Sequence, residues 1–456
     1  MSAFTGTAER GAAPAWQRAS NVSPLADLPA KSTDRPGSLG AGSDGEGTAF
    51  GRAERAATNG SPYGAPSDHV RAWDLPPFRS AAGVSPEDFG TGGPVESPKR
   101  RVRYRLRNLL RHLYPRKPDG NPSRFAACGR TSFGALLPIA KYVENANVRC
   151  VVTGVVSCGS VWSCPVCAGG ELAERANHVT HVVKWAKAKG YHATLVTLTV
   201  RHAAADSFRE LLDGLLGAGR AFWQGEASEE LRDKIGLVGW VRTLDATEGP
   251  NGYHPHFHYV VITRRRLYQR VGNRVRWWGA LWQEWTARWQ TMVREHLGPA
   301  FVPLPDYAVD FTPCDSDGSY ISKAGLELGD VDAKHPKPPN RTIWQVGISA
   351  ARGNKGDHAR WLTWVEGTKG RKKMGWSQGR FDLRQLSGLK AAEEKEAEER
   401  PEPEIVHTLF AEEWIRLRSI PDAVDVLLCV AEAGKDVAAC LDRLLGPRAP
   451  PRGPPN

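Results

Sequence analysis

The chain has no long hydrophobic run. None of its apolar stretches approaches the roughly 18–20 residues that cross a bilayer. The first ten residues, Met1–Arg10, also lack the apolar core of a secretory signal. We therefore expect a cytoplasmic protein with no membrane among its partners. The sequence has no internal repeat either.

Acidic residues are outnumbered by basic ones. The 456 residues include 50 Asp and Glu against 61 Lys and Arg, a formal net charge of +11 and a pI near 9.3. Such an excess favours a polyanionic partner, with nucleic acid first and an anionic membrane surface second.

Cysteine is too scarce for a disulfide scaffold, with eight in the whole chain. Five of them crowd together, and in a reducing compartment that pattern indicates metal. Cys164 and Cys167 have the two-residue gap of a zinc knuckle, and Cys158 lies six residues earlier. The fourth ligand is Cys128 or Cys150. Four thiolates would make a closed, structural zinc site.

Residues 1–98 are rich in Gly, Ala, Ser and Pro and have no sustained apolar periodicity, so we expect disorder there. The rest divides by composition. We expect a basic arm and cysteine segment over 99–170, a main domain over 171–389, a charged linker over 390–403, a small helical region over 404–446 and a loose tail over 447–456.

Periodicity predicts an α+β fold. Helices are expected over residues 171–189, 207–224, 404–419 and 421–445, and strands over 191–200, 237–245, 253–262 and 307–312. Asn251-Gly252 between two of these strands is a strong hairpin signal, which makes the sheet antiparallel there. Four tryptophans at helical spacing, Trp278, Trp282, Trp285 and Trp289, indicate a core face more than a base-stacking platform.

The run Tyr253–Ile262 contains the most informative candidate functional residues. Successive side chains on a strand point to opposite faces, so His254, His256 and His258 share one face. Imidazoles two residues apart converge on one point, as a metal ion requires. A surface strand rich in histidine is the simpler alternative, but only 13 histidines occur in the chain.

A third ligand is needed for an open metal site. The hairpin partner offers Asp245 and the turn offers Glu248; we favour Asp245 because it lies on the strand, and His254 remains a spare imidazole. Carboxylate plus imidazole suits Mg²⁺ or Mn²⁺ at a phosphate oxygen, and equally zinc hydrolysis or non-haem iron.

Tyr320 and Lys323 favour phosphate chemistry, because they share one face of an expected helix. A tyrosine hydroxyl is a competent nucleophile when a nearby cation favours the phenolate, and Lys323 could neutralise developing charge.

Basic residues gather in three places where phosphate contact or a solvated charged face is expected. They are Arg101, Arg103, Arg105 and Arg107; Arg264, Arg265 and Arg266; and Arg371, Lys372 and Lys373.

Together, the histidine strand, the strand Thr194–Thr199 and Tyr320-Ile321-Ser322-Lys323 resemble plasmid rolling-circle replication initiators. These form a single-tyrosine branch of the HUH endonuclease superfamily. The segment Cys158–Cys167 and the basic stretch Gly370–Arg380 are similar to those of initiators from actinomycete plasmids. An acidic residue before the histidines, here Asp245, is also typical, although the family usually has glutamate.

The resemblance implies a central antiparallel sheet flanked by helices, a palm-like fold, with residues 171–389 as the endonuclease domain. His256 and His258 would be the metal pair and Tyr320 the nucleophile, and Cys128-Gly129 would supply the fourth zinc ligand. The tyrosine would nick one strand at the double-strand origin and keep the 5′-phosphate, and host polymerase would extend the 3′-hydroxyl. Some relatives activate water with a glutamate near the tyrosine, where this chain has Asp315 and Asp317. The C-terminal helices could contact a second copy or a host helicase.

Three alternatives stay open. A transposase or relaxase would use the same chemistry, although relaxases usually place the tyrosine before the histidines. A plasmid regulator would bind DNA through the zinc segment and basic arms without cleaving it. A metallohydrolase acting on small phosphoesters would not need Tyr320.

Overall fold

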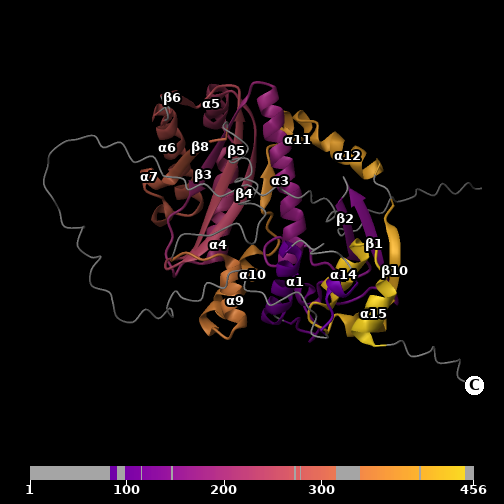
Figure 1. Ribbon diagram of the computed structural model, residues 1–456. Helices are drawn as coiled ribbons and strands as arrows, with labels where there is room; N and C mark the ends of the chain where they lie inside the picture. The colour runs from indigo at the N-terminus through magenta and orange to yellow at the C-terminus, as the bar shows by residue number, and fades with distance from the viewer. Residues whose placement is uncertain are drawn as a thin grey trace, which may run out of the picture.

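A five-stranded antiparallel sheet forms the centre of the larger of two units (Figure 1). The computed structural model describes residues 83–89, 98–114, 116–144, 147–271, 274–277, 279–314, 339–399 and 402–446. The strand order is β8-β3-β5-β4-β9. The strands are β3 (His192–Thr199), β4 (Leu237–Gly249), β5 (Gly252–Thr263), β8 (Val309–Pro313) and β9 (Met374–Trp376).

The predicted hairpin is confirmed. Strands β4 and β5 are paired from Leu237↔Thr263 to Gly249↔Gly252, and Gly252 has the positive φ of 84° that the tight turn requires. The register sets Asp245 directly opposite His256. On the other side of β5, β3 sets Thr197 opposite His258.

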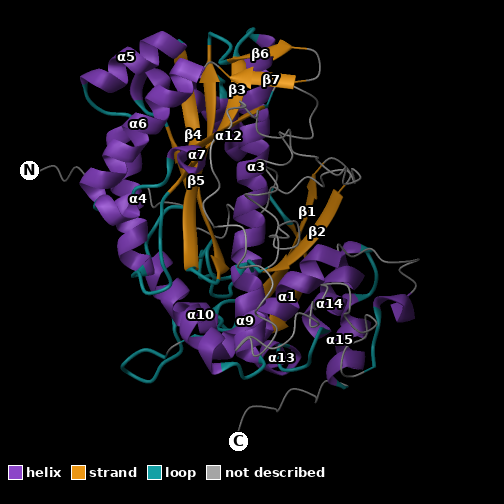
Figure 2. Cartoon of the chain, turned by 90° about the vertical axis from the view of Figure 1, so that its left-hand side faces the viewer, coloured by secondary structure: helices purple, strands orange, loops and turns teal. Residues whose placement is uncertain are grey.

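One face of this sheet packs against α4 (Phe208–Phe222) and α6 (Gly279–His296), as Figure 2 shows. Phe257 and Tyr259 of β5 lie in this core together with Trp285 and Trp289, both fully buried. The core role expected for the tryptophan stripe is therefore confirmed for these two. Trp278 lies outside the described residues.

The other face packs against α3 (Pro165–Ala188), which stands between the two units. Val179, Val182 and Val183 of α3 share a core with Val260 and Ile262 of β5. Alternation along β5 therefore puts the three histidines on the face that α3 covers, past the end of this apolar cluster.

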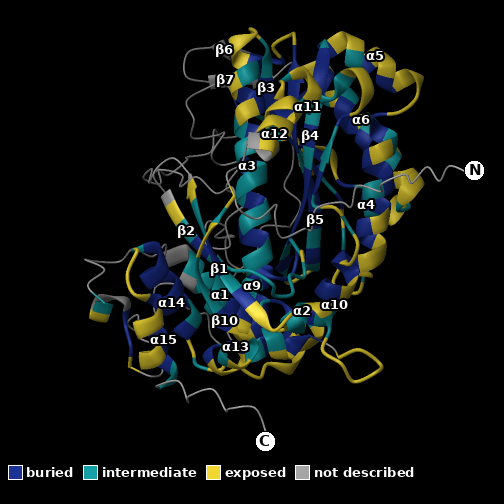
Figure 3. Cartoon of the chain, turned by 90° about the vertical axis from the view of Figure 1, so that its right-hand side faces the viewer, coloured by how far each residue is buried: buried dark blue, intermediate teal, exposed yellow. Residues whose placement is uncertain are grey.

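The second unit joins the two ends of the described chain. A three-stranded antiparallel sheet has the order β10-β1-β2, from β1 (Leu136–Glu144), β2 (Asn147–Val152) and β10 (Glu404–Phe410). Helices α13 (Ala411–Leu417), α14 (Ala423–Glu432) and α15 (Val437–Leu445) bury their apolar faces against it. Figure 3 shows this second buried core beside the first.

The remaining elements connect or cover these units. They are η2 (Pro86–Phe89), α1 (Pro98–Leu110), η3 (Arg111–Leu113), α2 (Arg124–Ala127), α5 (Glu226–Ile235), β6 (Tyr268–Val271), β7 (Arg274–Trp277), η4 (Pro299–Phe301), α7 (Pro305–Ala308), α9 (Ile343–Ala351), α10 (Lys355–Thr368), η5 (Gly379–Phe381), α11 (Leu383–Leu386) and α12 (Leu389–Glu399).

Several expectations need correction. The helix expected over 404–419 is wrong at its start, because Glu404–Phe410 is a strand that pairs with β1. The expected helix over 421–445 is two helices that break at Gly434. Val84 is buried in the second core, so order begins before residue 99. Residues 390–399, expected as a linker, are helical, and the expected boundary at 170 falls inside α3. No described helix is both long and apolar enough to span a membrane.

Candidate functional site

Three side chains of the β4–β5 hairpin converge at one point. The ligand atoms of Asp245, His256 and His258 all lie within 4.8 Å of one another. The two Nε2 atoms are 3.1 Å apart, and Oδ2 of Asp245 is 4.0 Å from Nε2 of His256. Asp245 and His256 are buried, while His258 is half-buried.

Neighbouring groups orient both imidazoles. Nδ1 of His256 donates a hydrogen bond of 3.1 Å to the carbonyl oxygen of His254, which leaves the lone pair of the neutral ring on Nε2. Nδ1 of His258 shares a 3.0 Å hydrogen bond with the hydroxyl of Thr197 on β3. Both Nε2 atoms therefore point into the same space.

The donor set fits a divalent ion. Metal–nitrogen bonds of about 2.1 Å at right angles put two ligand atoms about 3 Å apart, which matches the Nε2 separation. Ligand atoms on opposite sides of such an ion would be roughly 4–4.5 Å apart, close to the span of the cluster. The set of two nitrogens and one oxygen does not identify the ion.

The two alternative ligands point elsewhere. Glu248 is buried in an ion-pair network, 2.8 Å from Nε of Arg341 and 3.1 Å from Nε of Arg360. Arg341 also donates two 2.8 Å hydrogen bonds to Asp357. Burial raises the pKa of Asp357, but hydrogen bonds from Arg341 and Ser349 and the charges of Arg341 and Arg360 together outweigh burial, so the pKa lies below its usual range. Arg341 thus fastens the chain before α9 to the tip of the hairpin.

His254 lies beside the cluster without joining it. Its Nδ1 is 3.3 Å from Nδ1 of His202, a residue that sequence reasoning missed. Burial lowers the pKa of His202. Thr197 was also missed, since only the pairing of β3 with β5 reveals that it faces His258.

Tyr320, Lys323, Asp315 and Asp317 lie outside the described residues. The described chain on either side of them is fixed to the main sheet. The amide of Cys314 donates to the carbonyl of Ala193, and Arg341 exchanges two backbone hydrogen bonds with Glu248. Along β5, His256 lies between Ile262, which is opposite Ala193, and Tyr253, which is opposite Glu248.

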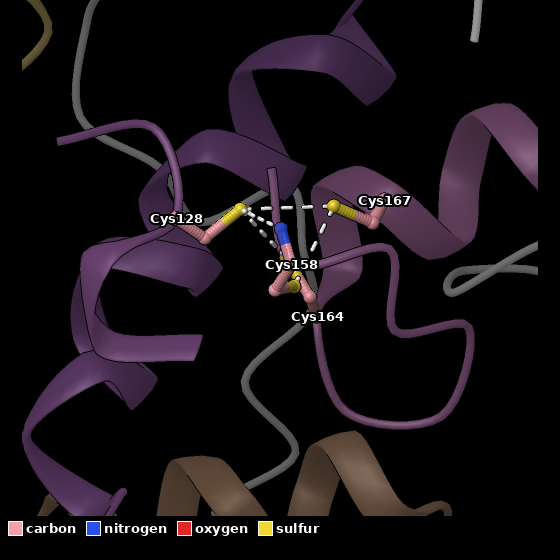
Figure 4. A group of neighbouring side chains, drawn as sticks. All are labelled: Cys128, Cys158, Cys164 and Cys167. Atoms are coloured by element: carbon pink, nitrogen blue, oxygen red, sulfur yellow. Dashed lines mark hydrogen bonds between the residues drawn. The ribbon is translucent and has the colours of Figure 1, made fainter. Parts of the chain in front are cut away.

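A second candidate metal centre gathers four cysteines (Figure 4). Cys128, Cys158, Cys164 and Cys167 converge from the end of α2, the loop between β2 and α3, and the start of α3. The Sγ atoms of Cys128 and Cys167 are 3.6 Å apart, as are those of Cys158 and Cys167, and Cys128–Cys164 is 3.8 Å. Cys150 lies elsewhere, buried in the second core.

These separations fit a tetrahedral ion. Zinc–sulfur bonds of about 2.3 Å put the sulfurs of a ZnS₄ centre about 3.8 Å apart. Hydrogen bonds from the thiols of Cys128, Cys158 and Cys164 lower the pKa of Cys167 well below its usual value. Cys167 therefore favours thiolate, the form that binds metal, while the same hydrogen bonds raise the pKa of Cys158 and Cys164.

The basic residues expected to contact phosphate differ in exposure. Arg264, Arg265 and Arg266 are exposed just after β5, and Lys372 is exposed before β9. Lys373 lies over the ring of Trp162, while Arg371 pairs with Asp213 at 2.6 Å.

The arginines of α1 have intramolecular neighbours. Arg105 pairs with Asp422, Arg103 packs against Gly169, and Arg107 is buried against Gly129. The side chain of Arg101 is not described. Phosphate contact by these residues stays a prediction.

Comparison with known proteins matches residues 151–299 to a family described as replication protein. Protein rep of Streptomyces lividans is 29% identical over 308 residues, which cover 54% of this chain and 67% of that protein. A neomycin resistance protein of Streptomyces cyanogenus is 31% identical over 159 residues, 29% of this chain and 36% of the relative. Protein rep of a Bacillus species is 25% identical over 124 residues, 26% of this chain and 39% of the relative. The last two are thus matched over little more than a third of their length. No solved structure matches the chain.

Proposed function

We propose, on the premise that residues 151–299 match the replication protein family, that the protein is a plasmid replication initiator that nicks and rejoins one DNA strand. The observation that carries the proposal is the convergence of Asp245, His256 and His258 on one face of a hairpin. An imidazole pair with a carboxylate at this spacing suits a cation that contacts a phosphate oxygen. The fold would be that of the HUH endonucleases.

Asp245, His256 and His258 would hold Mg²⁺ or Mn²⁺. A bound divalent ion supplies Lewis-acid polarisation of the scissile phosphate. Thr197 and the carbonyl of His254 hold both imidazoles so that their Nε2 atoms lie 3.1 Å apart in the ligand cluster. Phe257 and Tyr259, buried on the opposite face, fix the strand so that the ligands need little reorganisation.

Tyr320 would be the nucleophile. Its Oη gives up its proton to solvent and attacks phosphorus, the bond from phosphorus to the 3′-oxygen breaks, and the 3′-oxygen leaves as a hydroxyl after taking up a proton from solvent. The product is a 5′-phosphotyrosine whose bond energy permits rejoining. Lys323 would stabilise the phenolate and the developing charge, and Asp315 or Asp317 would activate water for a terminating cleavage. In support, the segment that carries these residues starts and ends on the sheet that holds the histidines.

The four cysteines would hold a structural Zn²⁺, with Cys128 as fourth ligand. The exposed Arg264, Arg265, Arg266 and Lys372 would contact phosphates of origin DNA and of the displaced single strand. Host polymerase would extend the 3′-hydroxyl and a host helicase would open the duplex.

The test is a nicking assay on supercoiled DNA that carries the replication origin, with Mn²⁺ and increasing salt. We expect a nicked product covalently linked to protein from the wild type, and none from His256→Ala. His254→Ala is the matched control, because it removes an imidazole of the same strand that lies outside the ligand cluster. His256→Ala should retain most of its DNA affinity, since that affinity comes from phosphate contacts elsewhere.

Three results would contradict the proposal. Binding without any nicking would favour a regulator. Nicking that survives His256→Ala would exclude the ligand assignment. Nicking that needs a site other than the replication origin would favour a transposase or relaxase.

A further inference from the structure

A pocket lined by arginines lies between α1, the cysteine centre and the C-terminal helices. Four guanidinium groups border it, those of Arg107, Arg111, Arg130 and Arg418. It is small, with a cavity volume of about 20 Å³. None of the residues of the candidate catalytic cluster lines it.

The four arginines come from three separate parts of the chain. Arg107 and Arg111 lie on α1 and η3, Arg130 follows Cys128 by two residues, and Arg418 caps the C-terminus of α13. Nη1 of Arg418 donates to the carbonyl oxygen of Arg130, which holds the last two together. Only Arg107 was among the DNA-contact residues expected from the sequence.

Two carboxylates, Asp422 and Asp425, also border the pocket, each near an arginine that does not line it. Asp422 accepts hydrogen bonds from Nε and Nη2 of Arg105, the first at 2.8 Å. Asp425 lies 3.8 Å from Nε of Arg100. Within the described part of the chain, none of the four lining arginines forms an ion pair with a carboxylate.

The guanidinium groups are also short of hydrogen-bond acceptors. Arg107 is only 9% exposed, and its Nε has no acceptor among the described residues. The same holds for Nε of Arg111 and of Arg418. Unsatisfied, like-charged donors gathered in a partly buried site are unfavourable unless an anion enters.

A loaded cysteine centre would balance only part of this charge. Four thiolates around a divalent ion carry a net charge of −2, and Arg107 packs against Gly129, next to Cys128. Arg130 and Arg418 would remain in excess. The N-terminus of α14 adds its partial positive charge, because Val424 and Asp425 of its first turn also line the pocket.

We propose that this pocket binds one phosphate group, and that the group is a backbone phosphodiester of the DNA. That this phosphate group comes from DNA rests on the proposed function. Guanidinium forks match two phosphate oxygens at once, which makes arginine the residue suited to this contact. The C-terminal unit would thereby help to position the DNA together with the cysteine segment.

The test uses the full-length, zinc-loaded protein and the variants Arg418→Gln and Arg111→Gln. Arg209→Gln is the matched control, since Arg209 is an exposed arginine of α4 that pairs with Glu366 and does not line the pocket. Inorganic phosphate is titrated by calorimetry, and a short single-stranded oligonucleotide is titrated by fluorescence anisotropy over a range of salt. Bound zinc is measured in every sample.

We expect each pocket variant to bind both probes about three- to tenfold more weakly, with normal zinc content. The slope of log affinity against log salt should become shallower by about 0.7 for each phosphate that the variant no longer neutralises. The control should match the wild type.

Unchanged affinity for both probes would overturn the inference. Weaker phosphate binding with unchanged DNA affinity would mean that the pocket binds a free anion and not a phosphate of the DNA backbone, which would overturn the inference. Loss of zinc with unchanged affinity for both probes would mean that the arginines serve only the metal centre. A wild type that binds DNA through these arginines but never nicks it would refute the proposed function and leave the pocket standing.

Discussion

Replacing Thr197 by valine should weaken metal binding without touching a metal ligand. The hydroxyl of Thr197 lies 3.0 Å from Nδ1 of His258, and its removal frees the imidazole to rotate. Valine has nearly the same shape and suits a strand, so the sheet should keep its packing.

The size of the effect follows from the role of the hydrogen bond. Loss of a group that orients a metal-binding histidine typically lowers metal affinity by about 10–100-fold, which corresponds to roughly 1.4–2.8 kcal/mol. Because His258 is only half-buried, water can partly replace the hydroxyl, and we expect the lower half of that range.

Titration of Mn²⁺ followed by electron paramagnetic resonance gives the dissociation constant directly. Nicking at saturating Mn²⁺ should recover most of its rate, because the ligands themselves are intact. Thr194→Val is the matched control. Thr194 lies on the same strand with its side chain on the opposite face, and its buried hydroxyl has no partner among the described residues.

Equal Mn²⁺ affinity in Thr197→Val and the wild type would show that the hydroxyl of Thr197 does not orient His258 for metal binding. So would an equal loss in Thr194→Val, because the effect would then come from the strand and not from the orientation of His258.

Three further outcomes are expected. Cys128→Ser should lose the zinc of the cysteine centre and Cys150→Ser should keep it, as elemental analysis can measure. Glu248→Gln should lower the free energy of unfolding by about 2 kcal/mol in denaturant titration, because Arg341 and Arg360 lose a buried partner. Burial raises the pKa of Asp425 to about 6, above its unfolded value of about 3.9, so stability from this group falls as pH rises from 4 to 6. Asp425→Asn should remove that fall, by up to about 3 kcal/mol at pH 7.5.

Each has a contradicting result. Loss of zinc in Cys150→Ser would indicate that Cys150 and not Cys128 is the fourth zinc ligand. Wild-type stability in Glu248→Gln would show that the ion pairs with Arg341 and Arg360 do not stabilise the fold. An unchanged dependence of stability on pH in Asp425→Asn would exclude a raised pKa for Asp425.

The main sheet was predictable because its signals are local. The alternation from Tyr253 to Ile262 and the Asn251-Gly252 turn specify a strand and its hairpin partner within a few residues. The pairing register of β4 and β5 in the structure then sets Asp245, and not Glu248, opposite His256. The ligand role of all three residues stays a prediction.

Strand pairing between distant parts of the chain could not be predicted from the sequence. Glu404–Phe410 contains Ile405, Val406 and Thr408, which suit a strand, but its partner β1 lies in the first third of the chain. The acidic helix that follows, α13, made the whole stretch resemble one amphipathic helix. The arginine pocket and the hydrogen bond between Thr197 and His258 could not be predicted for the same reason, because each joins residues that are far apart in the sequence.

The proposed mechanism requires Tyr320 to become covalently joined to DNA. Mass spectrometry of the protein after it cleaves single-stranded origin DNA with Mn²⁺ tests this most directly. We predict a nucleotide adduct on the peptide that contains Tyr320, and neither adduct nor cleavage with Tyr320→Phe. An adduct on another residue, or cleavage by Tyr320→Phe, would show that Tyr320 is not the nucleophile.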